Sequence, residues 1–197
     1  MTTPETAKPG KSAFQEYAES IVVAVILALV VRTFFVQAFK IPTGSMQPTL
    51  MVGDRILVNK VVYGIPVPFT SWRFPKVREP QRGDMIVFQA PDDPHRDFIK
   101  RLVAVGGDEV EIRDLRLWIN GRPLTDPPKF RELVYYNRGP FGQLGKPVKV
   151  PPRQFFFLGD NSASSRDSRY WGFMPKSHII GKAFVIYWPP RRIRWLR

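Results

Sequence analysis

The sequence contains no cysteine and only two histidines, His95 and His178. The absence of cysteine excludes disulfide bonds, thiolate catalysis, zinc ribbons and iron–sulfur clusters. The two histidines stand far apart in the sequence, which excludes the paired histidines of a helical zinc-protease motif. We therefore expect no metal site and no cofactor, and we expect both histidines to be ordinary surface or core residues.

Acidic residues are also scarce: 17 Asp and Glu stand against 30 Lys and Arg, which gives a formal net charge of +13. A strongly basic chain is typical of proteins that bind nucleic acid or an anionic membrane surface, and charge alone does not choose between them. The 197 residues are enough for one domain with a sizeable core and an appendage. Twenty prolines argue against an all-helical protein.

Long apolar runs are absent except near the N-terminus, where residues 21–31 are all apolar and further apolar residues follow to Phe39. This stretch approaches the ~20 residues that a membrane-spanning helix needs. A cleaved signal peptide would need small residues directly after the apolar core, where Arg32 stands instead. A buried core helix remains an alternative. We predict a membrane anchor over 17–39, preceded by a disordered tail over 1–16.

Beyond residue 40 the sequence changes to short runs of β-branched and aromatic residues, separated by proline, glycine and aspartate. Such runs, without helical periodicity between them, are typical of antiparallel strands. Asn120-Gly121 predicts a hairpin, because both residues tolerate the positive φ of a type I′ turn. We predict a mainly β protein: an antiparallel β-barrel or sandwich domain over 40–197 after one transmembrane helix, with an inserted excursion or small lobe at about 123–152. The predicted strands are 55–62, 85–89, 98–105, 109–112, 115–119, 154–158 and 179–188.

A serine and a lysine are the candidates for chemistry. Ser45 lies in the segment IPTGSMQPTL, where two prolines and a glycine restrict the backbone and leave the serine accessible. A nucleophilic serine needs a base, and a lysine serves if burial keeps its amine neutral. Strand alternation puts Lys100 on one face with Phe98 and Leu102 and turns Arg101 outward. An ordinary turn serine and a surface lysine are the alternatives.

Four separated motifs resemble those of the bacterial type I signal peptidases and follow that family's order. The resemblance extends from the apolar segment to about Trp188. Each motif alone is weak, but four in the same order are specific. The motifs are SMQPTL at 45–50, GDRILVNK at 53–60, KRLVAVGGD at 100–108 and GDNSASSRDSR at 159–169.

The resemblance implies a membrane-bound serine endopeptidase that removes N-terminal signal peptides from exported preproteins at Ala-x-Ala sites. It implies that Ser45 is the nucleophile and Lys100 the general base. It also implies that the hydroxyl of Thr43 and the backbone N–H of Ser45 form the oxyanion hole.

The resemblance further implies supporting residues. Ser165 matches the serine that holds the lysine amine in place, and Asp167 with Arg169 resembles a supporting ion pair. Apolar residues beside the dyad are candidates for shallow substrate pockets, with the substrate added as a strand, although core packing explains each of them equally well. These candidates are Ile41, Pro42, Met46, Leu50, Phe98 and Ile99.

The expected partners are exported preproteins with signal peptides, membrane lipid and the secretion translocon, and not nucleic acid. The resemblance places the catalytic domain on the extracytoplasmic face of the cytoplasmic membrane and the tail over 1–16 in the cytoplasm. The Lys and Arg residues around the anchor are uninformative on orientation. The C-terminal WPPRRIRWLR is typical of an interfacial membrane contact or of a solvated basic tail.

Two other functions remain open. One is a membrane-tethered β-barrel that binds peptides or lipid, in which Ser45 and Lys100 are only structural. The other is a self-cleaving Ser/Lys protein similar to the SOS repressors, which should carry a helix-turn-helix where this chain has its apolar segment.

Overall fold

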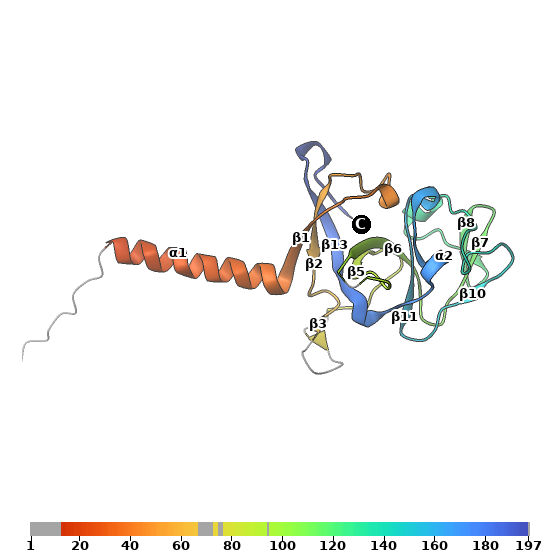
Figure 1. The fold of residues 1–197 in the computed structure, drawn as a ribbon, viewed down its shortest axis with the longest axis horizontal. Coiled ribbons are helices and arrows are strands. Elements are labelled where there is room, and N and C mark those ends of the chain that lie inside the picture. Colours follow the sequence, from red (N-terminus) through yellow and green to blue (C-terminus); the bar gives the residue numbers. More distant parts are fainter. Residues whose placement is uncertain (1–12, 67–72, 75–76, 94, 197) are drawn as a thin grey trace, which may run out of the picture.

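The computed structural model describes residues 13–66, 73–74, 77–93 and 95–196. A long apolar helix projects from a β-rich body (Figure 1). The body is built on a curled antiparallel sheet, a half-barrel, with a smaller sheet beside it. The predicted fold class, mainly β with one N-terminal apolar helix, is confirmed.

The apolar helix α1 spans Ala13–Val30 and continues as a π-helical turn over Val31–Phe35. By length and composition these 23 residues are able to cross a membrane. None of them is buried, which argues against the alternative of a buried core helix.

The helix has different limits from the predicted anchor. It ends before residue 39 because Val36–Lys40 forms strand β1, whose residues pair with β2 from Val36↔Asn59 to Lys40↔Arg55. Residues 13–16, predicted as tail, belong to α1, and residues 1–12 of the predicted tail lie outside the described residues.

The larger sheet has the strand order β1-β2-β13-β5-β6-β11-β12, and β14 pairs with β13. Neighbouring strands are antiparallel, and their inward-facing apolar residues form the core, as Ile56 and Val58 of β2 do with Ala183 and Ile186 of β13. Its strands are β1 Val36–Lys40, β2 Arg55–Asn59, β5 Met85–Gln89, β6 Asp97–Val105, β11 Gln154–Leu158, β12 Met174–Pro175, β13 Ile179–Trp188 and β14 Arg194–Trp195.

The smaller sheet has the order β10-β7-β8-β9, and β3 pairs with β4 in a separate ribbon. The predicted hairpin follows β8, where Asn120 and Gly121 have φ of 52° and 73°, as the turn requires. The remaining strands are β3 Ile65–Pro66, β4 Arg73–Phe74, β7 Glu109–Arg113, β8 Arg116–Ile119, β9 Arg122–Pro123 and β10 Val148–Lys149. Short helical turns are Gly44–Met46, Pro128–Arg131, Ser162–Ser164, α2 Ser168–Trp171, Lys176–His178 and Pro190–Arg192.

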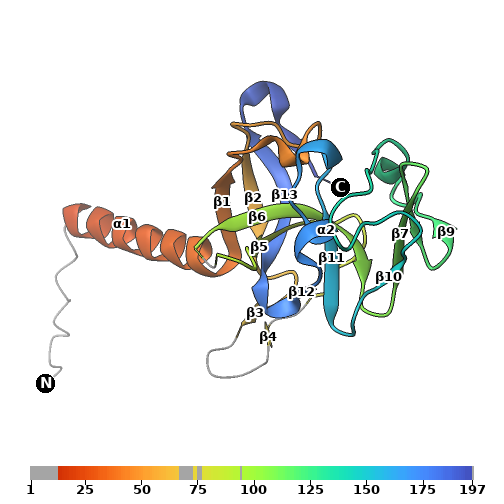
Figure 2. The same cartoon turned by 45° about the vertical axis from the view of Figure 1, so that its right-hand side comes forward.

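The smaller sheet and the residues between β9 and β10 form a lobe at the end of the body away from α1 (Figure 2). The lobe is not a separate unit, because Phe130, Tyr135 and Val150 are buried in one cluster with Val103 and Phe156 of the larger sheet. The segment 123–152, predicted as an excursion or small lobe, therefore contributes to the core.

Most strand limits agree with the predicted ones, and β5, β11 and β13 coincide with them. Strand β2 ends at Asn59 and not at 62. The side chain of Asn59 accepts the backbone N–H groups of Val61 and Val62, which turns the chain out of the sheet.

Candidate active site

Ser45 and Lys100 meet although they are 55 positions apart in the sequence. Ser45 lies in the short helical turn Gly44–Met46, between Pro42 and Pro48. Neither proline has a backbone N–H, so neither is able to donate a hydrogen bond within a sheet. Lys100 lies in the middle of β6. The Nζ of Lys100 is 2.7 Å from the Oγ of Ser45, within hydrogen-bond distance.

The Lys100 amine lies in a poorly solvated place, since only 4% of the residue is exposed. Burial lowers the pKa of Lys100 from 10.5 to about 8, and the negative charges of Asp167 and Asp160 oppose this lowering. With this pKa, roughly a tenth of the amine is neutral at pH 7 and most of it above pH 9. A neutral amine at this distance is able to accept the proton of the serine hydroxyl.

The last of the four motifs holds the turn that carries Ser45. Asn161 donates its backbone N–H to the carbonyl of Ser45 at 3.0 Å and its side-chain amide to the carbonyl of Gly44 at 3.1 Å. Gly159 packs against the same turn, and a Cβ at this position would lie 2.5 Å from the Ser45 carbonyl oxygen. The motif begins with glycine because no larger residue fits there.

Asp167 and Arg169 form a fully buried ion pair within the last motif. The Nε and Nη2 of Arg169 donate to the two carboxylate oxygens of Asp167, each at 2.8 Å. Asp167 also accepts the backbone N–H of Gly159, and Arg169 donates to Ser162 Oγ. These charge-assisted bonds fix the backbone that borders Ser45.

Ser165, the residue expected to hold the lysine amine, is buried. Its hydroxyl has no hydrogen-bond partner in the described part of the chain. A Cβ on Gly159 would lie 2.2 Å from this hydroxyl, so Ser165 borders the same backbone segment as Ser45. Its role toward Lys100 stays a prediction.

Arg101 does not point outward as strand alternation predicted, because only 1% of it is exposed. Its Nε and Nη2 donate to the two carboxylate oxygens of Asp160 at 2.7 and 2.6 Å, and its Nη1 donates to the Gly83 carbonyl. Thr49 Oγ1 donates to the same carboxylate. The prediction was wrong because β6 is covered on both faces, and a strand covered on both faces has no solvent side.

The pair of Arg101 and Asp160 is a part of the site that the sequence analysis missed. It joins β6, which carries Lys100, to the motif that holds the Ser45 turn. The available signal was that both residues lie inside motifs, directly beside Lys100 and Asn161.

A cavity of about 740 Å³ opens over the dyad and is lined by residues from the segment 41–46, from β6, from the turn before β6 and from the last motif. Thr43 and five of the six predicted substrate-binding residues line the cavity: Ile41, Pro42, Met46, Phe98 and Ile99. Leu50 does not line it, because it is fully buried in the core with Ile56 and Ala183.

Charged residues that were not among the predicted site residues also line this cavity. Most lie in or next to the turn between β5 and β6, and Arg166 lies in the last motif, 3.2 Å from Asp92. His95 is exposed beside this turn, and His178 is half-buried away from the dyad. Within the described residues, no three His, Asp or Glu side chains form a group that would hold a metal ion.

Comparison with known proteins identifies the family. Residues 14–188 match the family described as signal peptidase, peptidase S26, and the chain belongs to that family. It is 36% identical to a probable signal peptidase I-2 of Synechocystis, over 98% of this chain and 81% of that protein. It is 38% identical to a signal peptidase I of Pseudomonas fluorescens, over 92% of this chain and 75% of that protein. The chain is also similar to a signal peptidase I from Enterococcus faecalis whose crystal structure is known. The two sequences are 32% identical, and the match covers 53% of this chain and 97% of that one, with a TM-score of 0.43.

Proposed function

We propose that this protein is a membrane-bound serine endopeptidase that removes N-terminal signal peptides from exported preproteins at Ala-x-Ala sites. Membership of the signal peptidase family supports cleavage of signal peptides. The observation that carries the catalytic proposal is the 2.7 Å contact between Ser45 Oγ and the buried amine of Lys100.

Acylation starts from the neutral amine of Lys100. The amine takes the proton of Ser45 while Oγ attacks the scissile carbonyl carbon, and the oxyanion accepts hydrogen bonds from the Ser45 backbone N–H and the Thr43 hydroxyl. The protonated lysine then gives its proton to the leaving amine, which becomes the N-terminus of the mature protein. The signal peptide remains as an ester on Ser45.

Deacylation uses the same amine a second time. Neutral Lys100 removes a proton from water, which attacks the ester carbonyl, and the proton is returned to Ser45 Oγ as the signal peptide leaves with a free carboxylate. In this proposal Ser165 holds the amine in line for both steps. The buried hydroxyl of Ser165 and its place next to Gly159 support that role.

The cavity over the dyad is proposed to bind the signal peptide as an added strand. Its walls are mainly apolar close to Ser45, where Ile41, Met46 and Ile99 lie. Shallow apolar walls favour small residues such as alanine next to the scissile bond, because a larger side chain would have to displace buried core residues.

The helix over Ala13–Phe35 is proposed to anchor the enzyme in the cytoplasmic membrane, with the catalytic domain on the extracytoplasmic face. Its length, composition and lack of buried residues support a spanning helix. Signal peptides, membrane lipid and the secretion translocon are the proposed partners, and nucleic acid is not.

The proposal is tested with the purified full-length protein in detergent and a preprotein whose signal peptide ends in Ala-x-Ala. Wild type, Ser45→Ala and Lys100→Met are compared, with Lys146→Ala as a control at an exposed lysine outside the cavity. We expect cleavage after the second alanine by wild type and control only, with all four proteins folded by circular dichroism. Cleavage by all four would contradict Ser45 and Lys100 as the dyad. Cleavage by none while all are folded would instead support the peptide- or lipid-binding alternative.

A further inference from the structure

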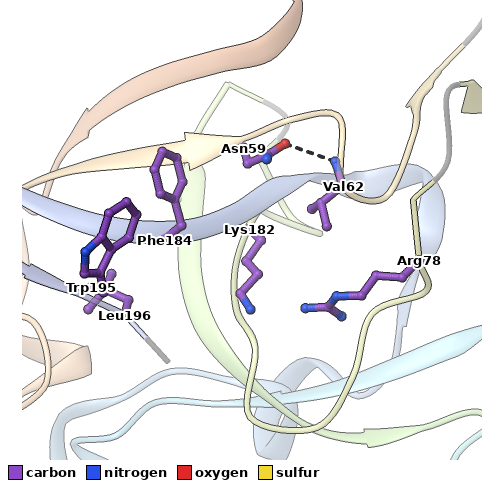
Figure 3. A pocket seen from close by; sticks show the side chains of 7 residues that line it. All are labelled: Asn59, Val62, Arg78, Lys182, Phe184, Trp195 and Leu196. Carbon is purple, nitrogen blue, oxygen red and sulfur yellow. Dashed lines mark hydrogen bonds between the residues drawn. The ribbon is translucent and has the colours of Figure 1, made fainter.

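A second pocket, of about 410 Å³, shares no lining residue with the cavity over the dyad. Figure 3 shows Lys182 and Arg78 on one side of it, with their nitrogen-bearing ends directed toward one another. Phe184 and Trp195 lie together on the other side. The pocket thus has a cationic end and an aromatic end.

The cationic end has an excess of positive charge. Lys182 and Arg78 both pair with one carboxylate, Asp84, at 2.8 Å. Although burial raises the pKa of Asp84, the hydrogen bonds from Arg78 and Lys182 outweigh it and lower this pKa to about 2, so the carboxylate stays ionised. Two cations against one anion leave one net positive charge, and about a quarter of each cationic side chain remains exposed.

The aromatic end presents an exposed indole. Trp195 stacks on Phe184, with ring centroids 5.9 Å apart, and 69% of Trp195 is accessible. Tryptophan is enriched at the interface between the hydrocarbon core of a membrane and water, because its ring is apolar and its N–H remains hydrated.

The pocket lies beside the point where the apolar helix ends. Asn59, on the rim of the pocket, pairs with Val36, the first residue after the helix, and also pairs with Lys182. The next residue, Lys60, donates to the carbonyls of Thr33 and Phe35 in the last helical turn. Val36, Asn59 and Lys182 thus lie side by side on three adjacent strands. Adjacent strands are about 4.8 Å apart, so the Lys182 backbone lies roughly 10 Å from the end of the helix.

We propose that this pocket binds the headgroup of an anionic phospholipid. The phosphate contacts the exposed parts of Arg78 and Lys182 that Asp84 does not occupy, and the glycerol and first methylene groups pack against Phe184 and Trp195. The proposal rests on the proposed function in that the helix must span the membrane, since the helix end then places the pocket at the depth of the headgroups. A lipid held here fixes how the catalytic domain is turned about the helix axis.

Native mass spectrometry of the full-length protein in detergent tests the proposal by counting bound phosphatidylglycerol, phosphatidylcholine or glycerol phosphate. The variants are Lys182→Gln, which keeps a donor for Asp84, and Trp195→Ala, at a largely exposed position. The control is Lys146→Gln, which removes the same charge from an exposed site outside the pocket. Circular dichroism checks that each variant is folded.

Wild type and control are expected to bind one phosphatidylglycerol tightly. Lys182→Gln is expected to bind it roughly fivefold more weakly, about the effect of one basic side chain near an anionic lipid. Trp195→Ala is also expected to bind it more weakly, because the exposed indole is lost. Equal binding by folded Lys182→Gln and wild type would overturn the proposal. So would glycerol phosphate binding as tightly as phosphatidylglycerol, because the site would then be for a free phosphate. Cleavage of the preprotein is measured on the same samples, so a protein that binds lipid without cleaving contradicts only the proposed function.

Discussion

At the scale of single residues, the environment of one amine sets the proposed chemistry. Lys100 has almost no contact with solvent. Its Nζ lies 5.5 Å from the ring centroid of Phe98, and the ring of Trp171 stacks on that of Phe98. Burial favours the neutral amine, whereas the aromatic face and the two nearby carboxylates favour the charged form. Burial prevails, so a large part of the amine is neutral at mildly alkaline pH, as the proposed role of general base requires.

The rate of cleavage is therefore expected to rise with pH through an apparent pKa of about 8, because Lys100 is lowered to that value and only its neutral form accepts a proton. The measurement is kcat/KM for a signal-peptide substrate from pH 6 to 10. N-ethylmaleimide serves as a control and should have no effect, since the chain has no cysteine. A flat profile, or a midpoint near the usual pKa of histidine, would contradict Lys100 as the base.

Gly159→Ala is expected to reduce kcat by roughly a hundredfold. The added methyl group would lie 2.5 Å from the Ser45 carbonyl oxygen and 2.2 Å from Ser165 Oγ, so it must displace Ser45 or Ser165. If Ser45 is the nucleophile, a displacement of about 1 Å lowers the rate by about this factor. Steady-state kinetics with the folded variant measure the effect. Gly145→Ala is the control: an added Cβ there meets nothing within 4 Å, and the strain of an alanine at its φ of 67° lies away from the site, so this variant should keep full activity. Wild-type kinetics for Gly159→Ala would show that the turn has more room than the structure indicates.

At the scale of elements, the site depends on bonds between β6 and the last motif. Arg101 on β6 and Asp160 in the motif form a pair with two parallel hydrogen bonds, and almost none of either side chain is exposed. Thr49, from the segment that follows Ser45, donates to the same carboxylate. Three segments far apart in the sequence therefore meet at one buried charge.

Asp160→Asn is expected to lower the free energy of unfolding by about 3–5 kcal/mol, because the guanidinium of Arg101 is left buried without a counter-charge. Urea denaturation followed by circular dichroism measures the change. Asp114→Asn, at an exposed position, makes the same chemical change and should alter stability by less than about 0.5 kcal/mol. If the two variants were equally stable, the ion pair of Arg101 and Asp160 would make no net contribution to the free energy of unfolding.

At the scale of the whole molecule, the lobe and the larger sheet share a core, and the helix joins the body through β1. Lobe residues Phe130 and Tyr135 pack with Val103 and Phe156 of the sheet. The lobe also reaches the last motif, since the Tyr136 carbonyl accepts from Arg169. We therefore expect the extramembrane part to unfold as one cooperative unit.

Phe130→Ala is expected to cost about 3–5 kcal/mol by leaving a cavity in this shared core. Loss of activity and loss of β-sheet ellipticity should then follow the same denaturation curve, displaced to lower urea. Val134→Ala, at a partly exposed position of the lobe, should shift the curve much less. Two separate transitions would show that the lobe folds independently of the site.

The sequence by itself determined the features that depend on neighbouring residues. The apolar run predicted the helix, short runs of β-branched and aromatic residues predicted β5, β11 and β13, and Asn120-Gly121 predicted its turn. The four motifs, taken together, singled out Ser45 and Lys100, which no spacing rule would have paired.

Only the tertiary structure decided the features that depend on distant partners. The helix ends at Phe35 because the following residues pair with β2, Arg101 is buried because the lobe covers the second face of β6, and Leu50 faces the core and not the cavity. Local periodicity records which residues prefer to be buried, but it does not record which other segment buries them. That choice is made by contacts between residues dozens of positions apart, and it also brings the amine of Lys100 to the hydroxyl of Ser45.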